Sequence, residues 1–250
     1  MIQIKNAAQI ALMREAGRIT GEALVLAGEA VREGVSTKHL DDIIHDHIVR
    51  SGARPSFLGY GGFPGSACIS LNDEVIHGIP SKDRILKEGD IVKIDVGAFY
   101  KGFHGDSANT FAVGNVSDEA KRLIEAAKIS FEMGIGQAKP GNRLGDVGFA
   151  IESYVRKCGF SVVREFVGHG IGKELHEDPS VPNYGTPGHG VKLCKGMAIA
   201  VEPMVNAGTH EVYVLPDRWT VKTKDGRLSA HYEHTNILTD DGVISTTKVN

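Results

Sequence analysis

The sequence predicts an α+β domain in which two pairs of helices alternate with groups of antiparallel strands. Apolar residues recur at helical spacing in four segments, and strict alternation of apolar and polar residues marks a strand at 91–100. The order is helices then strands, twice over, which suggests two related halves, although the letters themselves do not repeat. No linker rich in proline or serine separates the halves, so we expect residues 1–250 to form a single domain.

The first pair of helices is predicted by capping residues and apolar spacing. Asn6 and Gln9 have the form of a capping box, and apolar residues then recur near helical spacing to about residue 30. A second helix is expected to begin near Ser36 or Thr37 and to end before Gly52, which suits a left-handed terminator. Its charged residues are expected mainly on the side that faces water: Asp41, Asp42, His45 and Asp46.

A loop and a hairpin follow. Residues 55–65, PSFLGYGGFPG, are too rich in glycine and aromatic residues for a helix or strand, so we expect a loop of the kind that often lines a pocket. The alternating segment IVKIDVGAFY (91–100) and the segment GFHGDSANTFAVG (102–114) are joined by a turn-like YKG. Together they predict a β-hairpin, with His104, Asp106 and Ala108 on one shared face.

The second pair of helices and the remaining strands complete the pattern. Ser117 is a candidate cap for one helix, and apolar spacing predicts another from Leu144 to Gly159. The dipeptide Asp225-Gly226 turns the chain between the last two strand-like pieces. These pieces are SVVREFVG, MAIAVEPMV, EVYVL, WTVKT and LSAHYEHTNIL.

Composition limits the classes of function. With 41% hydrophobic and 24% charged residues, the chain has the balance of a soluble globular protein, and a net charge of −3 gives no electrostatic footprint for nucleic acid. The first residues lack the features of a secretory signal, and no apolar run approaches the ~20 residues of a membrane span, so a cytoplasmic location is the default expectation. Three scattered cysteines predict reduced thiols: Cys68, Cys158 and Cys194.

Four carboxylates in apolar strands carry the main functional signal. Asp95, Asp106, Glu202 and Glu233 each interrupt an apolar segment, and a half-buried carboxylate is unfavourable unless it is paired, hydrogen-bonded or bound to a metal. Taken alone, Asp95 is explained as well by a salt bridge with Lys93 or by a turn contact as by a functional site. Four unrelated ion pairs are a poorer explanation than one shared site.

If the four carboxylates converge with one histidine, two divalent cations would neutralise them. Ligands rich in oxygen with one imidazole suit Mn, Fe, Co or Zn, and a metal pair is a known arrangement for activating water. The segment GHGIGKELHEDP (168–179) offers His169 and His176, but most histidines are hydrogen-bonded core or surface residues, so this segment alone does not identify the ligand. The residues therefore favour the hypothesis of a dinuclear hydrolase.

Five segments resemble the successive signatures of type I methionine aminopeptidases, in that family's order and across nearly the whole chain. They are NDEVIHGIP, KIDVGAFYKGFHGDSANTF, VGHGIGKELHEDP, AVEPMV and HYEHT. The resemblance implies the pita-bread fold, in which two pseudo-symmetric halves of helices and antiparallel strands enclose a metal pair. It makes residues 1–250 a single catalytic metallopeptidase domain.

The resemblance also implies the metal ligands. Asp95 should chelate one metal, and Asp106 and Glu233 should bridge both. His169 and Glu202 should bind the second metal. These five residues would hold two divalent cations, whose identity as Co, Mn, Fe or Zn the sequence does not determine.

Catalytic and substrate-binding roles follow by the same resemblance. His176 should hydrogen-bond the substrate near the scissile carbonyl, His77 should contact the scissile amide nitrogen, and Glu202 should move protons. Phe63 stands where some bacterial members have tyrosine, and Leu175 where they have phenylalanine, so the shape of the methionine pocket is less well defined than the metal site. The residues that match the pocket or its mouth are Phe57, Tyr60, Phe63, Cys68, Leu175 and Trp219.

The resemblance predicts a bacterial-type enzyme that removes the first methionine from nascent polypeptides with a small second residue, by attack of metal-activated water on the first peptide bond. We expect a cytoplasmic monomer with no nucleic-acid or membrane partner, and contact with the ribosome stays open. One alternative is an aminopeptidase acting before proline or a creatinase-like hydrolase, although those usually carry an additional N-terminal domain. Another is a binding protein that has the fold without the chemistry, although all five ligands are present here.

Overall fold

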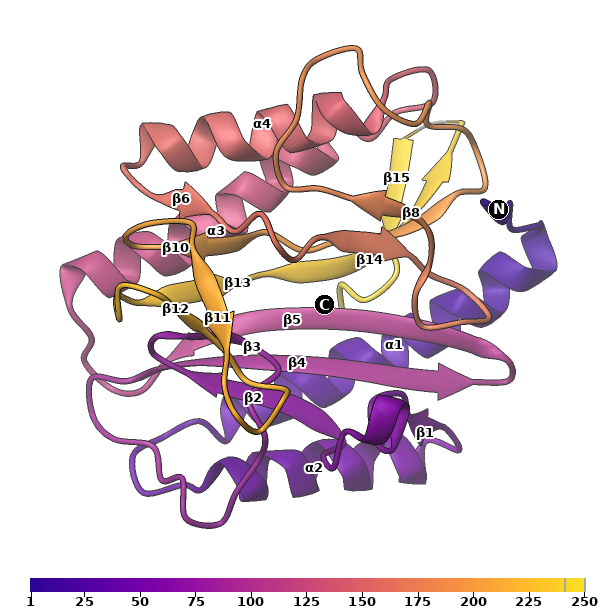
Figure 1. The fold of residues 1–250 in the computed structure, drawn as a ribbon. Helices are drawn as coiled ribbons and strands as arrows, with labels where there is room; N and C mark the ends of the chain where they lie inside the picture. The colour runs from indigo at the N-terminus through magenta and orange to yellow at the C-terminus, as the bar shows by residue number, and fades with distance from the viewer. Residues whose placement is uncertain (241, 250) are drawn as a thin grey trace.

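The protein folds into a curved antiparallel sheet with helices packed on its outer face (Figure 1). The computed structural model describes residues 1–240 and 242–249. Two helices, α1 (Ala7–Glu29) and α2 (Thr37–Arg50), cover one half of the sheet, and α3 (Asp118–Ile135) and α4 (Leu144–Lys157) cover the other. A short 3₁₀ turn, η1, spans Tyr60–Gly62. Two helices on each half agree with the predicted duplication of the pattern.

The strands are short apart from one long hairpin. Their bounds are β1 Arg54–Pro55, β2 Ala67–Leu71, β3 Glu74–Ile76, β4 Ile91–Tyr100, β5 Phe103–Ala112, β6 Ser161–Val162, β7 Gly168–Gly170, β8 Glu177–Val181, β9 Ala198–Val201, β10 Met204–Asn206, β11 Val212–Val214, β12 Val221–Thr223, β13 Ser229–His231, β14 Glu233–Thr239 and β15 Gly242–Ser245.

Within the described residues, one sheet of nine strands forms the centre of the molecule. Its order is β1-β4-β5-β14-β9-β7-β8, with β2 also paired to β4 and β15 to β14. Two three-stranded sheets, β13-β10-β6 and β11-β12-β3, flank it. The central order places β4 and β5 from the first half beside β14, β9 and β7 from the second, so the two halves of the chain meet in the middle of one sheet.

The four predicted helices are confirmed. Asn6 accepts from the backbone N–H of Gln9 at 3.0 Å, and the Gln9 side chain accepts from the Asn6 N–H at 2.9 Å, which completes the capping box. Ser36 and Ser117 cap α2 and α3 in the expected way. Gly52, with φ of 72°, ends the turn after α2 in the left-handed conformation that glycine adopts without strain.

The hairpin is confirmed as well. β4 and β5 pair from Ile91 opposite Ala112 to Tyr100 opposite Phe103, and the two turn residues, Lys101 and Gly102, both have positive φ, as a two-residue hairpin turn requires. Gly105 on β5 is packed against α1: a Cβ there would lie 2.9 Å from backbone atoms of Ala16 and Gly17. Since side chains alternate along a strand, the neighbours of Gly105 point to the opposite, inner face of the sheet.

One residue of α2 corrects the prediction of a solvated charged face. Asp41 is buried, because its carboxylate accepts from the N–H of Ser66 at 2.7 Å and of Ala67 at 3.0 Å, and from Lys38 Nζ at 2.9 Å. These hydrogen bonds compensate for the loss of water and attach the start of β2 to α2. Asp42 and Asp46 do face solvent.

Several strands differ from the prediction. SVVREFVG contains β6 and only the first residue of β7, with no strand between them. The chain does turn near Asp225, but β12 pairs with β3 and β11 rather than with β13. The strands β1, β2, β3, β8 and β15 were not predicted, and β1 includes Pro55, the first residue of the predicted loop. They are two to five residues long, too short for a clear alternation, and β8 includes Pro179. Among the described helices, none is long and apolar enough to cross a membrane.

Candidate metal centre and substrate cavity

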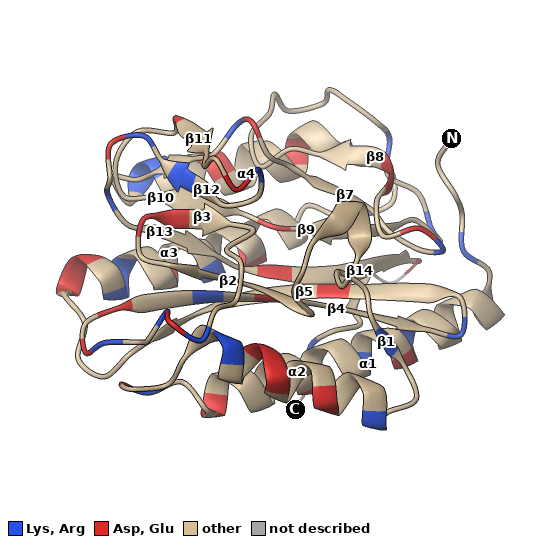
Figure 2. Ribbon diagram, turned by 60° about the horizontal axis from the view of Figure 1, so that its bottom comes forward, with Lys and Arg blue, Asp and Glu red and all other residues tan. Residues whose placement is uncertain are grey.

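Strand register brings three of the predicted ligands to one place. Ala108 on β5 lies opposite Asp95 on β4 and opposite Glu233 on β14, so the two carboxylates flank a small side chain on the inner face. Asp106 lies two residues before Ala108 and shares its face. Figure 2 shows acidic positions on these central strands, where the ribbon otherwise carries few charges. The methyl group of Ala108 leaves the space between the carboxylates open.

The other two predicted ligands come from β7 and the end of β9. His169 lies opposite Ala200, which also faces Thr235 of β14, and Glu202 follows directly after β9. Thr235 bonds to the backbone of Asp106 in both directions, at 2.9 Å each, which fixes β14 against β5. Each ligand candidate therefore stands on, or next to, a strand of the central sheet.

The predicted ligand atoms converge. One ligand atom each from Asp106, His169 and Glu233 lie within 4.8 Å of one another. His169 Nε2 is 3.8 Å from Asp106 Oδ2 and 3.5 Å from Glu202 Oε1. These four residues and Asp95, the five predicted ligands, line one cavity. Lys93 does not pair with Asp95: it is buried and donates to the carbonyl oxygen of Asn72 at 2.7 Å, which removes the salt-bridge explanation of Asp95.

The chemistry of this donor set fits a divalent metal. Asp95 Oδ1, Asp106 Oδ1 and Glu233 Oε1 are buried and have no hydrogen-bond partner among the described residues. Burial raises the pKa of Asp95 to about 7, and burial with mutual repulsion raises the pKa of Asp106, Glu202 and Glu233 well above the usual range. Buried carboxylates that lack donors and repel one another are expected where a cation supplies the missing charge.

His169 presents a lone pair to this cluster. Its Nδ1 lies 2.9 Å from the carbonyl oxygen of Gly170, which can only accept, so Nδ1 carries the proton and Nε2 is free toward Asp106 and Glu202. Burial lowers the pKa of His169 to about 3, which keeps the ring neutral. A neutral imidazole oriented by a carbonyl is the usual form of a metal-binding histidine.

His176 lies beside His169 but is held differently. The two ring centroids are 4.3 Å apart, and His176 Nδ1 is 2.8 Å from the hydroxyl of Tyr60. The loop before His176 is closed by Glu177, whose carboxylate accepts from the N–H of Lys173 at 2.8 Å and pairs with the buried ammonium of Lys5. These contacts hold His176, which lines the same cavity as the predicted ligands.

His77 also lines the cavity. It follows β3 with φ of 60°, an unusual conformation for a residue with a side chain, and its ring packs edge-on against Phe166 with centroids 6.0 Å apart. Burial lowers the pKa of His77 to about 4. Both predicted catalytic histidines are therefore neutral at pH 7, since burial also lowers the pKa of His176.

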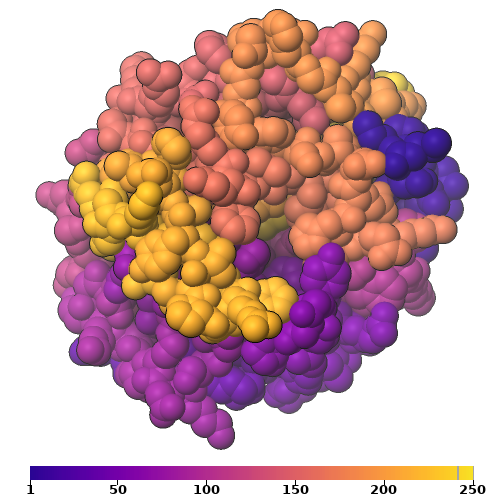
Figure 3. Space-filling model, viewed as in Figure 1, coloured from indigo at the N-terminus to yellow at the C-terminus, as the bar shows by residue number. Residues whose placement is uncertain are grey.

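The cavity itself has a volume of about 150 Å³ and opens in a hollow between the first and last quarters of the chain (Figure 3). In its wall Phe63 and Trp219 meet edge to face, with ring centroids 5.1 Å apart. Cys68, on β2, lies opposite Asp95 of β4 and is buried. The apolar wall comprises Phe57, Tyr60, Phe63, Cys68, Leu175 and Trp219, so the structure brings every predicted pocket residue together with the predicted ligands.

One histidine near the carboxylates was not singled out from the sequence. His231 is buried, with Nε2 3.9 Å from both Glu202 Oε2 and Glu233 Oε2, and neither ring nitrogen has a hydrogen-bond partner among the described residues. The available signal was its position in HYEHT, two residues before Glu233. β13 ends at His231 and β14 begins at Glu233, and the two side chains meet in the same cluster.

Comparison with known proteins gives the class: residues 11–240 match metallopeptidase family M24, and the chain belongs to this family. The relatives most similar along the full chain include methionine aminopeptidases. The chain is 54% identical over 242 residues to methionine aminopeptidase of Clostridium acetobutylicum, with 97% of each chain covered. It is 50% identical over 249 residues to methionine aminopeptidase 1 of Bacillus subtilis, with 100% of each covered. The resemblance inferred from the five sequence segments is thereby confirmed.

Solved structures confirm the pita-bread fold. The crystal structure of methionine aminopeptidase from Thermotoga maritima superposes with a TM-score of 0.98 at 44% identity, covering 100% of both chains. The prolidase from Pyrococcus furiosus has a TM-score of 0.79 at 23% identity, and the match covers 99% of this chain but 66% of that one. The second likeness concerns the fold alone. The protein is a metal-binding hydrolase of the M24 family.

Proposed function

We propose that the protein removes the N-terminal methionine from nascent proteins and peptides with a small second residue, using two divalent cations held by the five converging ligands. The observation that carries the proposal is the single cavity in which a carboxylate-rich cluster adjoins an apolar pocket. Full-length similarity to methionine aminopeptidases supports the choice of substrate. A cavity of about 150 Å³ is small beside the ~300–1,000 Å³ of common ligand pockets, which favours one residue and a small neighbour.

The proposed cofactor is a pair of Co, Mn, Fe or Zn ions. Asp95 would chelate one, His169 and Glu202 the other, and Asp106 and Glu233 both. When bound, such ions lower the pKa of water and polarise a carbonyl oxygen. Four carboxylates match the charge of two divalent ions, whereas one ion would leave two negative charges in a buried site.

The remaining steps fall to residues of the chain. Glu202, at the cavity wall 3.5 Å from His169 Nε2, would take a proton from the attacking water and pass it to the departing amine. His176, oriented by Tyr60, would hydrogen-bond the oxygen of the scissile carbonyl as negative charge develops on it. His77 would contact the scissile amide nitrogen. No covalent bond between enzyme and substrate is required.

Methionine would be selected by the apolar wall. A thioether is polarizable and interacts favourably with aromatic rings. Such rings come from Phe57, Phe63 and Trp219, which would surround the unbranched side chain of methionine. Tyr60 and Cys68 complete the contact surface. We propose further that the enzyme works as a cytoplasmic monomer on nascent chain termini.

The test is hydrolysis of Met-Ala-Ser beside Ala-Pro-Ser by the purified protein, after removal of metal and stepwise return of Mn, Fe, Co or Zn. Release of methionine alone, with two equivalents of metal needed for full activity, is the expected result. Cleavage before proline would assign the protein to the other aminopeptidases of the fold. Absence of cleavage with every metal would favour a binding protein without catalysis.

A further inference from the structure

We propose that Arg84 is a positioning residue for His77, holding the strained loop that carries this histidine into the substrate cavity. The inference rests on the proposed role of His77 in methionine removal. Arg84 belongs to no motif that the function uses and lies outside the residues that line the cavity. Its guanidinium nevertheless binds the chain on both sides of His77.

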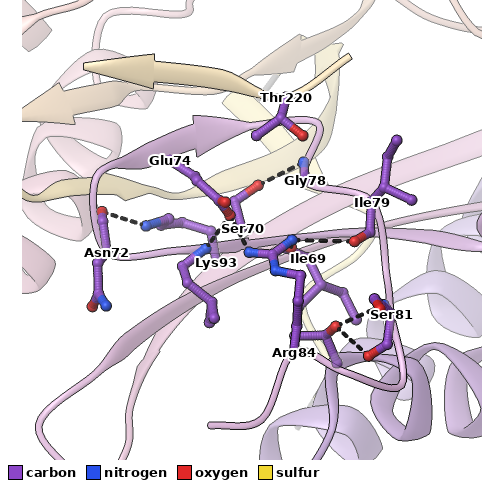
Figure 4. A network of polar contacts seen from close by, with 12 residues as sticks. Ile69, Ser70, Asn72, Glu74, Gly78, Ile79, Ser81, Arg84, Lys93 and Thr220 are labelled. Carbon is purple, nitrogen blue, oxygen red and sulfur yellow. Dashed lines mark hydrogen bonds and ion pairs between the residues drawn. The ribbon is translucent and has the colours of Figure 1, made fainter. Parts of the chain in front are cut away.

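The contacts of Arg84 form a clamp on the loop. Nη1 donates to the carbonyl oxygens of Ile79 at 3.1 Å and Ile69 at 3.3 Å, and Nη2 pairs with the carboxylate of Glu74. Glu74 precedes His77 by three residues, and Ile79 follows it by two. Figure 4 shows the guanidinium between these two residues, above Ile69 of β2. One planar cation thus connects the start and the end of the loop to the strand below it.

The loop needs such a clamp because His77 has φ of 60°, a conformation that persists in a residue with a side chain only where the surroundings enforce it. Neighbouring contacts enforce it at Gly78, whose N–H donates to Ser70 Oγ at 2.9 Å and whose carbonyl accepts from the Ile69 N–H at 2.8 Å. A Cβ at Gly78 would lie 2.3 Å from the Ile69 oxygen, so the loop lies directly on β2.

The clamp is anchored to a rigid element. The carbonyl oxygen of Arg84 accepts from the N–H of Thr37 at 2.8 Å, and Thr37 Oγ1 donates to the Ser81 carbonyl at 3.1 Å and accepts from its N–H at 2.9 Å, at the first turn of α2. The side chain of Arg84 is only 26% exposed and that of Glu74 15%. The position of His77 is therefore determined from α2 through Arg84, and a lysine could not reproduce the three-way contact of the planar fork.

The experiment compares Arg84→Met and Arg84→Lys with the wild-type enzyme on Met-Ala-Ser. We expect Arg84→Met to lower kcat about 10- to 100-fold with KM and metal affinity nearly unchanged, and Arg84→Lys to restore part of the loss. In a His77→Ala background, Arg84→Met should have no further effect, since it acts through His77. Arg50→Met, which removes an exposed arginine at the end of α2, is the matched control.

A second readout does not depend on activity. In long-range ¹H–¹⁵N spectra, the imidazole signals of His77, assigned from their loss in His77→Asn, should shift or broaden in Arg84→Met and in Glu74→Gln, while those of exposed His189 stay in place. Equal losses of kcat/KM in the wild-type and His77→Ala backgrounds, or unchanged His77 signals, would overturn the proposal. If the wild-type protein fails to cleave Met-Ala-Ser, the proposed function fails and the spectra still decide the role of Arg84.

Discussion

His169 and His176 lie with their ring centroids 4.3 Å apart at an interplanar angle of 65°, yet their Nδ1 atoms have different hydrogen-bond partners. The Nδ1 of His169 faces a backbone carbonyl, which leaves its Nε2 toward the carboxylates, whereas the Nδ1 of His176 faces the Tyr60 hydroxyl. A strand holds the first and a loop holds the second. These positions fit the proposed roles of His169 as a metal ligand and of His176 as a substrate-contacting residue.

The first prediction separates these two histidines. His169→Ala should lower the affinity for Co(II) or Mn(II) by about 100-fold or more and abolish turnover, because a ligand atom is lost. His176→Ala should bind metal as the wild type does, within about twofold, while kcat falls about 100-fold or more. Isothermal titration calorimetry with the metal, beside initial rates, makes the comparison. Equal loss of metal by both variants would contradict the assignment.

The second prediction concerns the repulsion within the carboxylate cluster. Asp106→Asn removes one charge and places an amide donor beside carboxylate oxygens that lack partners. Without metal, the variant should therefore be more stable than the wild type, with a free energy of unfolding higher by roughly 1–4 kcal/mol. Saturating metal should reverse the order, because only the wild type gains full binding energy. Urea unfolding with and without metal measures both.

The difference in stability between metal-free Asp106→Asn and the metal-free wild type should depend on pH. The folded-state pKa of Asp106 is raised above its unfolded value, so between those two values the folded chain holds a proton that the unfolded chain has lost. Stability of the metal-free wild type then falls as the pH rises above about 4, and the advantage of Asp106→Asn grows over that range. An advantage that is constant with pH would show that the carboxylate is not responsible.

How far the sequence could predict this site depends on where each residue lies. Four of the five candidate ligands could be singled out because a carboxylate in an apolar strand is conspicuous, and His169 was added because five motifs occur in a family's order. Strand alternation also predicted the shared inner face of Asp106 and Ala108, which the register confirms. The pita-bread fold followed from the resemblance, since short strands such as β2 and β3 leave no clear periodicity.

Contacts between distant segments were not predictable. Asp41 has the helical spacing of a solvated residue, and only the approach of Ser66, 25 positions away, turns it into a buried hydrogen-bond acceptor. The roles of Arg84 and Lys5 likewise depend on tertiary contacts that leave no local pattern. His231 is intermediate, because it belongs to one of the five motifs but its approach to Glu202 depends on a tertiary contact.

The third prediction uses the acid range. The pKa of His77 is lowered from 6.5 to about 4 by burial, so as the pH falls through this window the unfolded chain binds a proton that the folded chain does not. His77 therefore destabilises the fold below pH 6.5, by about 3 kcal/mol at pH 4. His77→Asn, which tolerates positive φ and does not titrate, should lose less stability between pH 6.5 and 4 than the wild type. If both proteins lost the same free energy of unfolding between pH 6.5 and 4, this role of His77 would be refuted.

The fourth prediction concerns the pair that closes the loop before His176. The side chains of Lys5 and Glu177 are 4% and 8% exposed, so Lys5→Met leaves a buried carboxylate without its cation and should lower the free energy of unfolding by about 3–5 kcal/mol. Lys224 and Glu211 form an exposed pair, with side chains that are 61% and 50% exposed. Lys224→Met should therefore change the free energy of unfolding by less than about 1 kcal/mol. Urea denaturation of the three proteins gives both differences.

The fifth prediction asks whether Cys68, which lines the cavity, takes part in the chemistry. Burial, with Asp95 and Asp106 nearby, raises the pKa of its thiol well above the usual range, so the thiolate that a nucleophile requires is scarce at pH 8. Iodoacetamide should therefore modify exposed Cys194 well before Cys68, as peptide mass mapping would show. Cys68→Ala should keep kcat within about tenfold and change mainly KM, since it alters only the wall of the methionine pocket. A loss of turnover comparable to that of Glu202→Gln would instead place Cys68 among the catalytic residues.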